Sequence, residues 1–278
     1  MRRARRSPAA GLGRHAALMV TVAFALLPFV WMVSLSTKAP AEIFEVTFRI
    51  WPETFYALEN YGRALAAAPL PRFILNGLIV TSAILALQIL IATPAAYALA
   101  KLRFRGREVL FALVLVALLL PKQVLALPHF IMLSGIGLLD SYAALILPSI
   151  VSPFAIFLFR QFFKTVPNDL IDAARLDGLS EIAILWRIMI PIAAPAIAAF
   201  GILSVVAHWN DLFWPLVVIR SEELATPPLG IIYFRNDDSG TEHGPMMAAA
   251  VLIAAPLVAA FLIAQRRFIE GITMTGAR

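Results

Sequence analysis

The residue types that carry covalent or metal chemistry are sparse in this 278-residue chain. It has no cysteine, which excludes thiolate nucleophiles, disulfides and iron–sulfur ligation. The four histidines, His15, His129, His208 and His243, show no paired spacing of the kind that binds a metal ion. A P-loop needs a lysine directly after a glycine, and none of the four lysines follows one. The sequence therefore predicts no enzyme, no metal site and no ATP bound by this chain.

Polar side chains that interrupt long apolar runs are the remaining candidates for function. A charged group at the centre of a membrane helix costs at least about 2.5 kcal/mol, so its presence there needs a reason. We consider six residues as lining a translocation path: Lys122, Gln123, His129, Trp209, Asn210 and Asp211. Aromatic rings beside hydrogen-bonding groups suit the apolar faces and hydroxyl edges of a sugar. The alternatives are snorkelling for Lys122, packing for His129 and an interfacial aromatic belt for Trp209.

The elements that would position these residues are membrane helices. The chain is 61% hydrophobic and only 14% charged, and its mean hydropathy is +0.84. A soluble domain of this size could not bury so much apolar surface. Six stretches are long enough to cross a bilayer as helices, at about 16–35, 73–100, 109–132, 142–163, 196–219 and 246–264. The predicted fold is an all-α membrane domain over 16–264, with tails at 1–15 and 265–278.

The distribution of Lys and Arg predicts the orientation of these spans. Sixteen cations fall in the N-terminal tail, the second-to-third and fourth-to-fifth connections and the C-terminal tail, whereas six fall in the other loops. The positive-inside rule then places both termini in the cytoplasm. The same rule explains the net charge of +6 without nucleic acid. The first apolar run is too long for a signal peptide, so we expect it to remain as a helix.

One cytoplasmic connection, at about 165–191, is patterned rather than merely polar. Leu170, Ile171, Ala173, Ala174 and Leu176 alternate with charged residues at helical spacing after a proline. The spacing of Asp172 and Arg175 allows an ion pair on one helix face, and Gly178 follows as a stop residue. Ser180 and Glu181 then indicate the start of a second helix that ends near Pro191. The pattern alone is also compatible with a simple elbow between two membrane helices.

The residues of this connection resemble the EAA loop of binding-protein-dependent ABC importer permeases. Asp172-Ala173-Ala174 is followed after three residues by Gly178, and after nine more by Ile188, Ile190 and Pro191. This spacing equals that of the family motif, with Asp172 in place of Glu and Ile190 in place of Leu. The resemblance implies a short coupling helix that docks on a cytoplasmic ATPase subunit. It implies that Asp172 makes a polar contact there, Ala173 and Ala174 permit close approach, and Gly178 allows the turn.

The resemblance extends along most of the chain, towards the MalG-like carbohydrate permeases. Its further motifs are Asn60-Tyr61, Phe73 to Asn76, Ala95 to Ala98, Phe104 to Arg107, Leu120-Pro121, Trp209 to Asp211 and Gln265 to Gly271. The resemblance implies a subunit that moves a sugar or oligosaccharide delivered by an extracytoplasmic binding protein. It also implies a homologous second permease and ATP-binding cassette subunits, which supply the ATP site that this chain lacks.

Two other functions are compatible with parts of the sequence. A permease for a polyol phosphate such as glycerol 3-phosphate would share the fold and the coupling loop. An ion-coupled secondary transporter would need several carboxylates at membrane depth, and Asp211 is the single clear candidate in the predicted spans.

The predicted orientation can be tested by labelling single cysteines in a chain that has none of its own. A membrane-impermeant thiol reagent should reach a cysteine at position 48 in intact cells and should miss one at position 178. The opposite pattern would invert the topology.

Overall fold

The computed structural model describes residues 8–45, 49–232, 234 and 242–275, and this part of the chain consists of helices and connections without a β-strand. Position 48 and parts of both predicted tails lie outside the described residues. The chain divides into two compact units. The first comprises Met1–Leu70 and Ile231–Ala254, and the second comprises Pro71–Gly230 and Ala255–Arg278.

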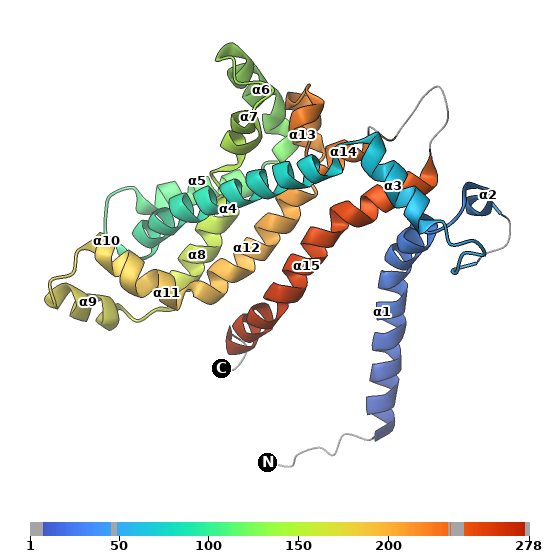
Figure 1. Ribbon diagram of the computed structural model, residues 1–278. Helices are drawn as coiled ribbons and strands as arrows, with labels where there is room; N and C mark the ends of the chain where they lie inside the picture. The colour runs from blue at the N-terminus through green and yellow to red at the C-terminus, as the bar shows by residue number, and fades with distance from the viewer. Residues whose placement is uncertain (1–7, 46–48, 233, 235–241, 276–278) are drawn as a thin grey trace. The chain divides into compact units, whose positions relative to one another are not determined.

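The helices of the described residues follow one another along the chain as shown in Figure 1. In order they are α1 (Pro8–Ser36), α2 (Pro40–Ile43), α3 (Ala57–Ala67), α4 (Leu70–Lys101), α5 (Arg107–Leu119), the 3-10 helix η1 (Lys122–Leu125), α6 (Ala126–Gly135), α7 (Tyr142–Ile146), the 3-10 helix η2 (Leu147–Ser149), α8 (Pro153–Thr165), α9 (Asn168–Leu176), α10 (Glu181–Ile184), the π-helix η3 (Leu185–Met189), α11 (Ile190–Ile192), α12 (Ala194–Trp209), α13 (Phe213–Val218), the 3-10 helix η4 (Glu222–Leu224), α14 (Pro227–Ile232) and α15 (His243–Thr275).

Three single helices and three bent pairs meet the length and apolarity that a membrane span requires. The single helices are Gly13–Ser36 within α1, the whole of α4, and His243–Ile263 within α15. The bent pairs are α5 with η1 and α6 at 99°, α7 and η2 with α8 at 42°, and α10 to α11 with α12 at 76°. If each bent pair is one span, the described residues contain six spans, in agreement with the sequence-based prediction.

The prediction of one continuous helix over 109–132 was wrong. Helix α5 ends at Leu119, and the chain turns at Leu120 and Pro121 before η1 begins. Leu120 is extended, with φ −78° and ψ 122°, because the ring of a following proline disfavours the helical region for the residue before it. Lys122 therefore begins a new helical segment after a sharp bend instead of lying inside a straight span.

The predicted helix over 196–219 is also interrupted. Helix α12 ends at Trp209 and α13 begins at Phe213. The two polar residues of the break satisfy backbone groups: the Asn210 side-chain amide donates to Val206 O at 2.8 Å, and an Asp211 carboxylate oxygen accepts from Trp214 N at 3.2 Å. Polar residues at this point of an apolar run thus have a structural use, since they cap the helices on both sides.

In the first unit, the segment after α1 is held by buried polar contacts. Lys38 is only 3% exposed, and its ammonium lies 4.6 Å from the centre of the Trp31 ring and donates to Arg49 O at 2.6 Å. The buried Asn60 of α3 donates to the carbonyls of Ser36 and Lys38. The segment that contains α2 and α3 is therefore fixed against the end of α1.

The core of the second unit lies among α4, α8, the α9 to α11 segment and α12. Small residues on α4, Ala92 and Ala96, are fully buried there and allow close helix approach. Phe159 and Phe163 of α8 fill the same core, and Phe200 of α12 packs edge-on against Phe159 at 5.4 Å between ring centres. Figure 1 shows α9 and α10 at one end of this unit, with α6, α7 and α13 near the other.

Polar side chains tie the helices of the second unit together. Ser204 of α12 donates to the Gln88 side chain of α4, and the Gln88 amide donates to Ser149 O. Nearer the start of α4, Asn76 donates to two carbonyls of the η4 segment and accepts from the Tyr142 hydroxyl at 2.6 Å. The side chains of Gln88, Asn76 and Ser204 therefore join neighbouring helices through hydrogen bonds, as small and neutral polar residues do in membrane helix packing.

Candidate functional site

Helix α9 spans Asn168–Leu176, where the residue pattern after the proline predicts a short helix. Pro167 precedes it with φ −58°, and Asp169 places a carboxylate in the first turn, where the helix dipole favours negative charge. Ile171 and Ala174, three residues apart, are buried in the core of the second unit at 1% and 5% exposure. One face of this short amphipathic helix is thus fixed to its own chain.

The end of α9 is a Schellman turn that requires a left-handed residue. Gly178 has φ +82°, and its N–H donates to Arg175 O at 3.0 Å while Leu179 N–H donates to Ala174 O at 3.0 Å. No atom lies within 4 Å of the place where a Cβ on Gly178 would sit. The need for glycine at this position is therefore conformational and does not come from crowding.

The second helix of the loop begins as predicted at Ser180, whose hydroxyl accepts from Ala183 N at 3.3 Å. It continues through α10, the π-helix η3 and α11 as far as Ile192. Ile188 lies in η3 and packs, partly buried, against the core, and Pro191 lies in α11. The motif residues that follow Gly178 therefore lead the chain from the loop into α12.

A chain of charged and polar contacts connects the two loop helices to α4. The Arg175 guanidinium donates to Asp172 at 2.9 Å, as its spacing predicted, and to Glu181 at 2.8 Å. The other carboxylate oxygen of Glu181 accepts from the Tyr97 hydroxyl at 2.5 Å. The hydrogen bond to Glu181 raises the pKa of Arg175 above its ordinary value. These groups are partly exposed, so the ion pairs contribute at most about 1 kcal/mol each, but they fix the direction of α9 relative to α4.

A second tie joins the same elements at the start of α9. The Lys101 ammonium, at the end of α4, donates to Val166 O at 2.5 Å and to the Asn168 side chain at 2.8 Å. The sequence did not indicate Tyr97, Lys101 or Asn168 as parts of the site, because each partner lies more than sixty residues away along the chain.

The opposite face of the loop is apolar and exposed. We define the docking face as Leu170, Ala173, Leu176 and Ile182. Leu176 is 90% exposed and Ile182 is 71% exposed. Of the two alanines in the motif, only Ala173 belongs to this face, because Ala174 is buried against its own chain. The Asp172 side chain is 62% exposed beside the docking face and remains accessible while it pairs with Arg175.

The candidate path residues lie in two segments. Lys122, Gln123 and His129 lie on η1 and α6, whereas Trp209, Asn210 and Asp211 lie at the break between α12 and α13. His129 of α6 packs edge-on against Trp214 of α13 at 6.0 Å between ring centres, and Asp211 caps the same tryptophan's backbone. Trp209 is buried at 4% exposure, whereas Lys122, Gln123 and Asn210 are exposed. The structure thus brings His129 and Asp211 to one aromatic residue, Trp214, whose indole N–H donates to Ala144 O at 2.9 Å.

No group of three His, Asp or Glu residues able to hold a metal ion occurs in the part of the chain that the structure describes.

Comparisons with known proteins agree on one kind of relative. A family model described as "Binding-protein-dependent transport system inner membrane component" matches residues 88–273. The arabinooligosaccharides transport system permease protein AraQ of Bacillus subtilis (strain 168) is 37% identical over 207 residues, which cover 74% of this chain and 73% of AraQ. The sn-glycerol-3-phosphate transport system permease protein UgpE of Escherichia coli (strain UTI89 / UPEC) is 32% identical over 265 residues, which cover 93% of this chain and 94% of UgpE.

A solved structure shares the fold at higher coverage. A chain of a bacterial ABC transporter involved in the import of the acidic polysaccharide alginate superposes with a TM-score of 0.82 and 25% identity. The match covers 96% of this chain and 99% of that one. A chain of the MetNI methionine ABC transporter, at 16% identity and a TM-score of 0.54, shares the fold alone.

Removing the Glu181 carboxylate should loosen α9. The substitution Glu181→Ala deletes the group that joins Arg175 to Tyr97, and a loss of about 1.4 kcal/mol in local stability corresponds to about tenfold faster opening. Hydrogen–deuterium exchange of peptides over 168–176 should accelerate accordingly. Asp177→Ala is the control, because this exposed carboxylate follows the C-terminal end of α9, where the helix dipole does not favour negative charge, and has no ion pair within the described residues. Equal exchange in both variants would show that the tie does not hold the helix.

Proposed function

Because the chain belongs to the family of binding-protein-dependent transport system inner membrane components, we propose that it is the permease subunit of an ABC importer and that α9 is its coupling helix. The observation that carries this proposal is the two-sided character of α9. Its inner face is fixed to α4 by Tyr97, Glu181 and Arg175, and its outer face leaves Leu176 almost fully exposed. An exposed apolar group on a rigid support suits contact with another protein.

The work of such a subunit is mechanical. ATP is bound and hydrolysed by partner ATPase subunits, whose closure displaces the docking face. The ties to Tyr97 and Lys101 pass this displacement to α4, and η3 and α11 pass it directly to α12. A movement of these helices switches the path between its inward-facing and outward-facing states. The relatives found are transport permeases, and no step of this cycle asks covalent chemistry of the chain.

The orientation that this function requires is the one predicted from the cations. With both termini and the 165–191 loop in the cytoplasm, Lys164, Arg175 and Arg187 lie on the side of the ATPase subunits. The membrane is then the inner membrane of a bacterium, and the segment after α1 faces the solute-binding protein. The apolar side chains of α1 are exposed within this chain, as expected for a helix that contacts lipid or the second permease subunit.

The solute we propose is a sugar or an oligosaccharide. Arg160 is buried among its own contacts: it lies 3.5 Å from the centre of the Phe111 ring, donates to Leu99 O and lies 3.7 Å from Glu108. Because Arg160 is occupied by these contacts, Lys122 is the cation of the predicted spans that we consider as a partner for an anionic solute. Trp214, His129 and Asn210 instead offer aromatic and neutral polar groups, which suit a hydroxyl-rich ligand.

A polyol phosphate is the second candidate, favoured by the likeness to UgpE over 93% of this chain. A phosphate in a low-dielectric path needs several Arg or Lys donors, which the partner permease would have to supply. Membership of a binding-protein-dependent family removes the case for an autonomous ion-coupled transporter.

Substitution of Gly178 tests the coupling role. In Gly178→Val the branched side chain opposes the left-handed conformation at a cost of about 1–2 kcal/mol, which should distort the end of α9. We expect solute uptake and binding-protein-stimulated ATPase activity to be lost while the permease pair still assembles. Gly178→Asn is the matched control, because asparagine tolerates positive φ, and it should retain activity. Normal stimulated ATPase activity in Gly178→Val would remove the coupling assignment.

Substitution of Lys122 tests the solute class. For a neutral saccharide, Lys122→Met should lower uptake by the reconstituted complex by less than about threefold, or roughly 0.6 kcal/mol. Lys164→Met, which removes a lysine at the end of α8, provides the control for a general effect of lost charge. The contrary result is that the binding protein stimulates ATPase activity only when it carries a phosphorylated polyol. If Lys122→Met then abolished this stimulation, the solute would be reassigned to a polyol phosphate.

A further inference from the structure

The connection between α4 and α5 carries four cations, of which the proposed transport mechanism uses Lys101 alone. Lys101, Arg103, Arg105 and Arg107 occupy alternate positions over seven residues at the point where the chain leaves one predicted span and enters the next. Phe104, between two of these arginines, is 41% exposed. Arginines around an exposed aromatic ring at a span end are typical of the membrane–water interface.

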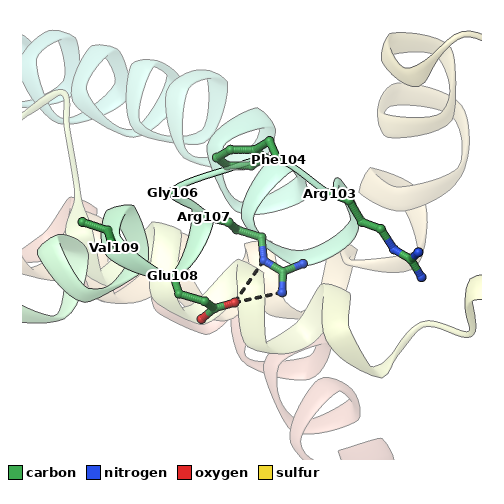
Figure 2. A pocket seen from close by; sticks show the side chains of 6 residues that line it. All are labelled: Arg103, Phe104, Gly106, Arg107, Glu108 and Val109. Atoms are coloured by element: carbon green, nitrogen blue, oxygen red, sulfur yellow. Dashed lines mark hydrogen bonds and ion pairs between the residues drawn. The ribbon is translucent and has the colours of Figure 1, made fainter.

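This connection surrounds an open hollow of about 460 Å³, shown in Figure 2. Its lining residues are Arg103, Phe104, Gly106, Arg107, Glu108 and Val109. Arg107 is already satisfied, because it donates to Glu108 at 2.8 Å and to Leu102 O at 3.3 Å. In Figure 2 the Arg103 side chain extends away from this pair.

The charge of the connection is not neutralised by its own contacts. Glu108 is the acidic residue of the hollow, and it lies near two guanidiniums, those of Arg107 and Arg160. Lys101 is directed to Val166 and Asn168. Within the described part of the chain, Arg103 and Arg105 have neither an ion pair nor a hydrogen-bonded partner. The guanidinium of Arg103, which lines the hollow, and that of Arg105, which lies two residues further along the connection and outside the lining, are thus available to an external anion.

An apolar groove of about 450 Å³ adjoins the hollow and shares Phe104 with it. The groove is lined by Ala95, Ala98, Leu113, Val114, Ala117 and Ile156, among other apolar residues of α4, α5 and α8. These residues lie within predicted spans, so the groove faces hydrocarbon depth while the arginines lie at the interface. The basic hollow and the apolar groove beside it together match the chemistry of an amphiphile with an anionic head.

We propose that this connection binds an anionic phospholipid, with its phosphate at Arg103 and Arg105 and an acyl chain in the groove beneath Phe104. Arginine is suited to phosphate because its planar donors bind two oxygens at once. Basic hollows between membrane helices at the cytoplasmic face are known to select anionic lipids. This lipid site rests on the proposed membrane location and orientation of the chain and is independent of the transported solute.

Native mass spectrometry of the purified transporter complex tests the proposal. The complex is titrated with phosphatidylglycerol or with phosphatidylcholine, and the lipid retained is counted. Arg103→Gln with Arg105→Gln should weaken retention of phosphatidylglycerol by about tenfold or more and leave that of phosphatidylcholine nearly unchanged. Arg14→Gln with Lys164→Gln removes two exposed cations elsewhere and should change neither lipid by more than about twofold. If the arginine pair does not assemble, Arg103→Gln alone should weaken phosphatidylglycerol by about fivefold.

The groove is tested separately from the arginines. Ala117→Phe fills it and should reduce retention of phosphatidylglycerol, whereas Ala112→Phe, on α5 but outside the groove, should not.

Unchanged phosphatidylglycerol retention in the arginine variants, or an equal loss of both lipids, would overturn the proposal. Displacement of the lipid by inorganic phosphate would assign the site to a soluble anion. Loss of the second permease subunit in Ala117→Phe, with lipid retained, would make the groove a subunit interface and equally overturn it.

Discussion

The bilayer imposes the constraint on which this structure depends: its interior offers no water to unpaired backbone groups. A span must therefore be helical, and every interruption must satisfy its own N–H and C=O groups. The interruption before α13 does so with Asn210 and Asp211, and the starts of α7 and α8 do so with the hydroxyls of Ser141 and Ser152. The positions of these polar residues are thus determined by the bends as much as by any ligand.

The loop between α8 and α12 obeys a different constraint under the proposed function, which requires it to transmit force in water. Burial of Ile171 and Ala174 places α9 against the core, and the contacts of Tyr97 and Lys101 connect it to the end of α4. Gly178 then permits the sharp turn that returns the chain to α10. A helix fixed in this way moves together with its support, so a push on its exposed face reaches the membrane helices instead of bending the loop.

The sequence predicted those features that depend on local pattern. Hydrophobic length predicted the three single-helix spans, and Gly178 and Ser180 predicted the end of α9 and the start of α10. The bend at Pro121 could have been anticipated from the restriction that proline places on Leu120, but its angle of 99° depends on packing. The partnership of Tyr97 with Glu181 joins residues 84 apart in sequence, so no local pattern contains it. The different burial of Ala173 and Ala174 was equally hidden, since both fit the same motif.

Site-specific crosslinking tests most directly whether α9 meets the ATPase through its docking face. Single cysteines at Ala173 and Leu176, on the exposed side, and at Ile171 and Ala174, on the buried side, can be modified with a short photoreactive maleimide in membranes that contain the whole transporter. We expect adducts with the ATPase subunit from positions 173 and 176 and little or none from positions 171 and 174. Absence of ATPase adducts from both exposed positions, with adducts to another protein or to lipid in their place, would contradict this expectation.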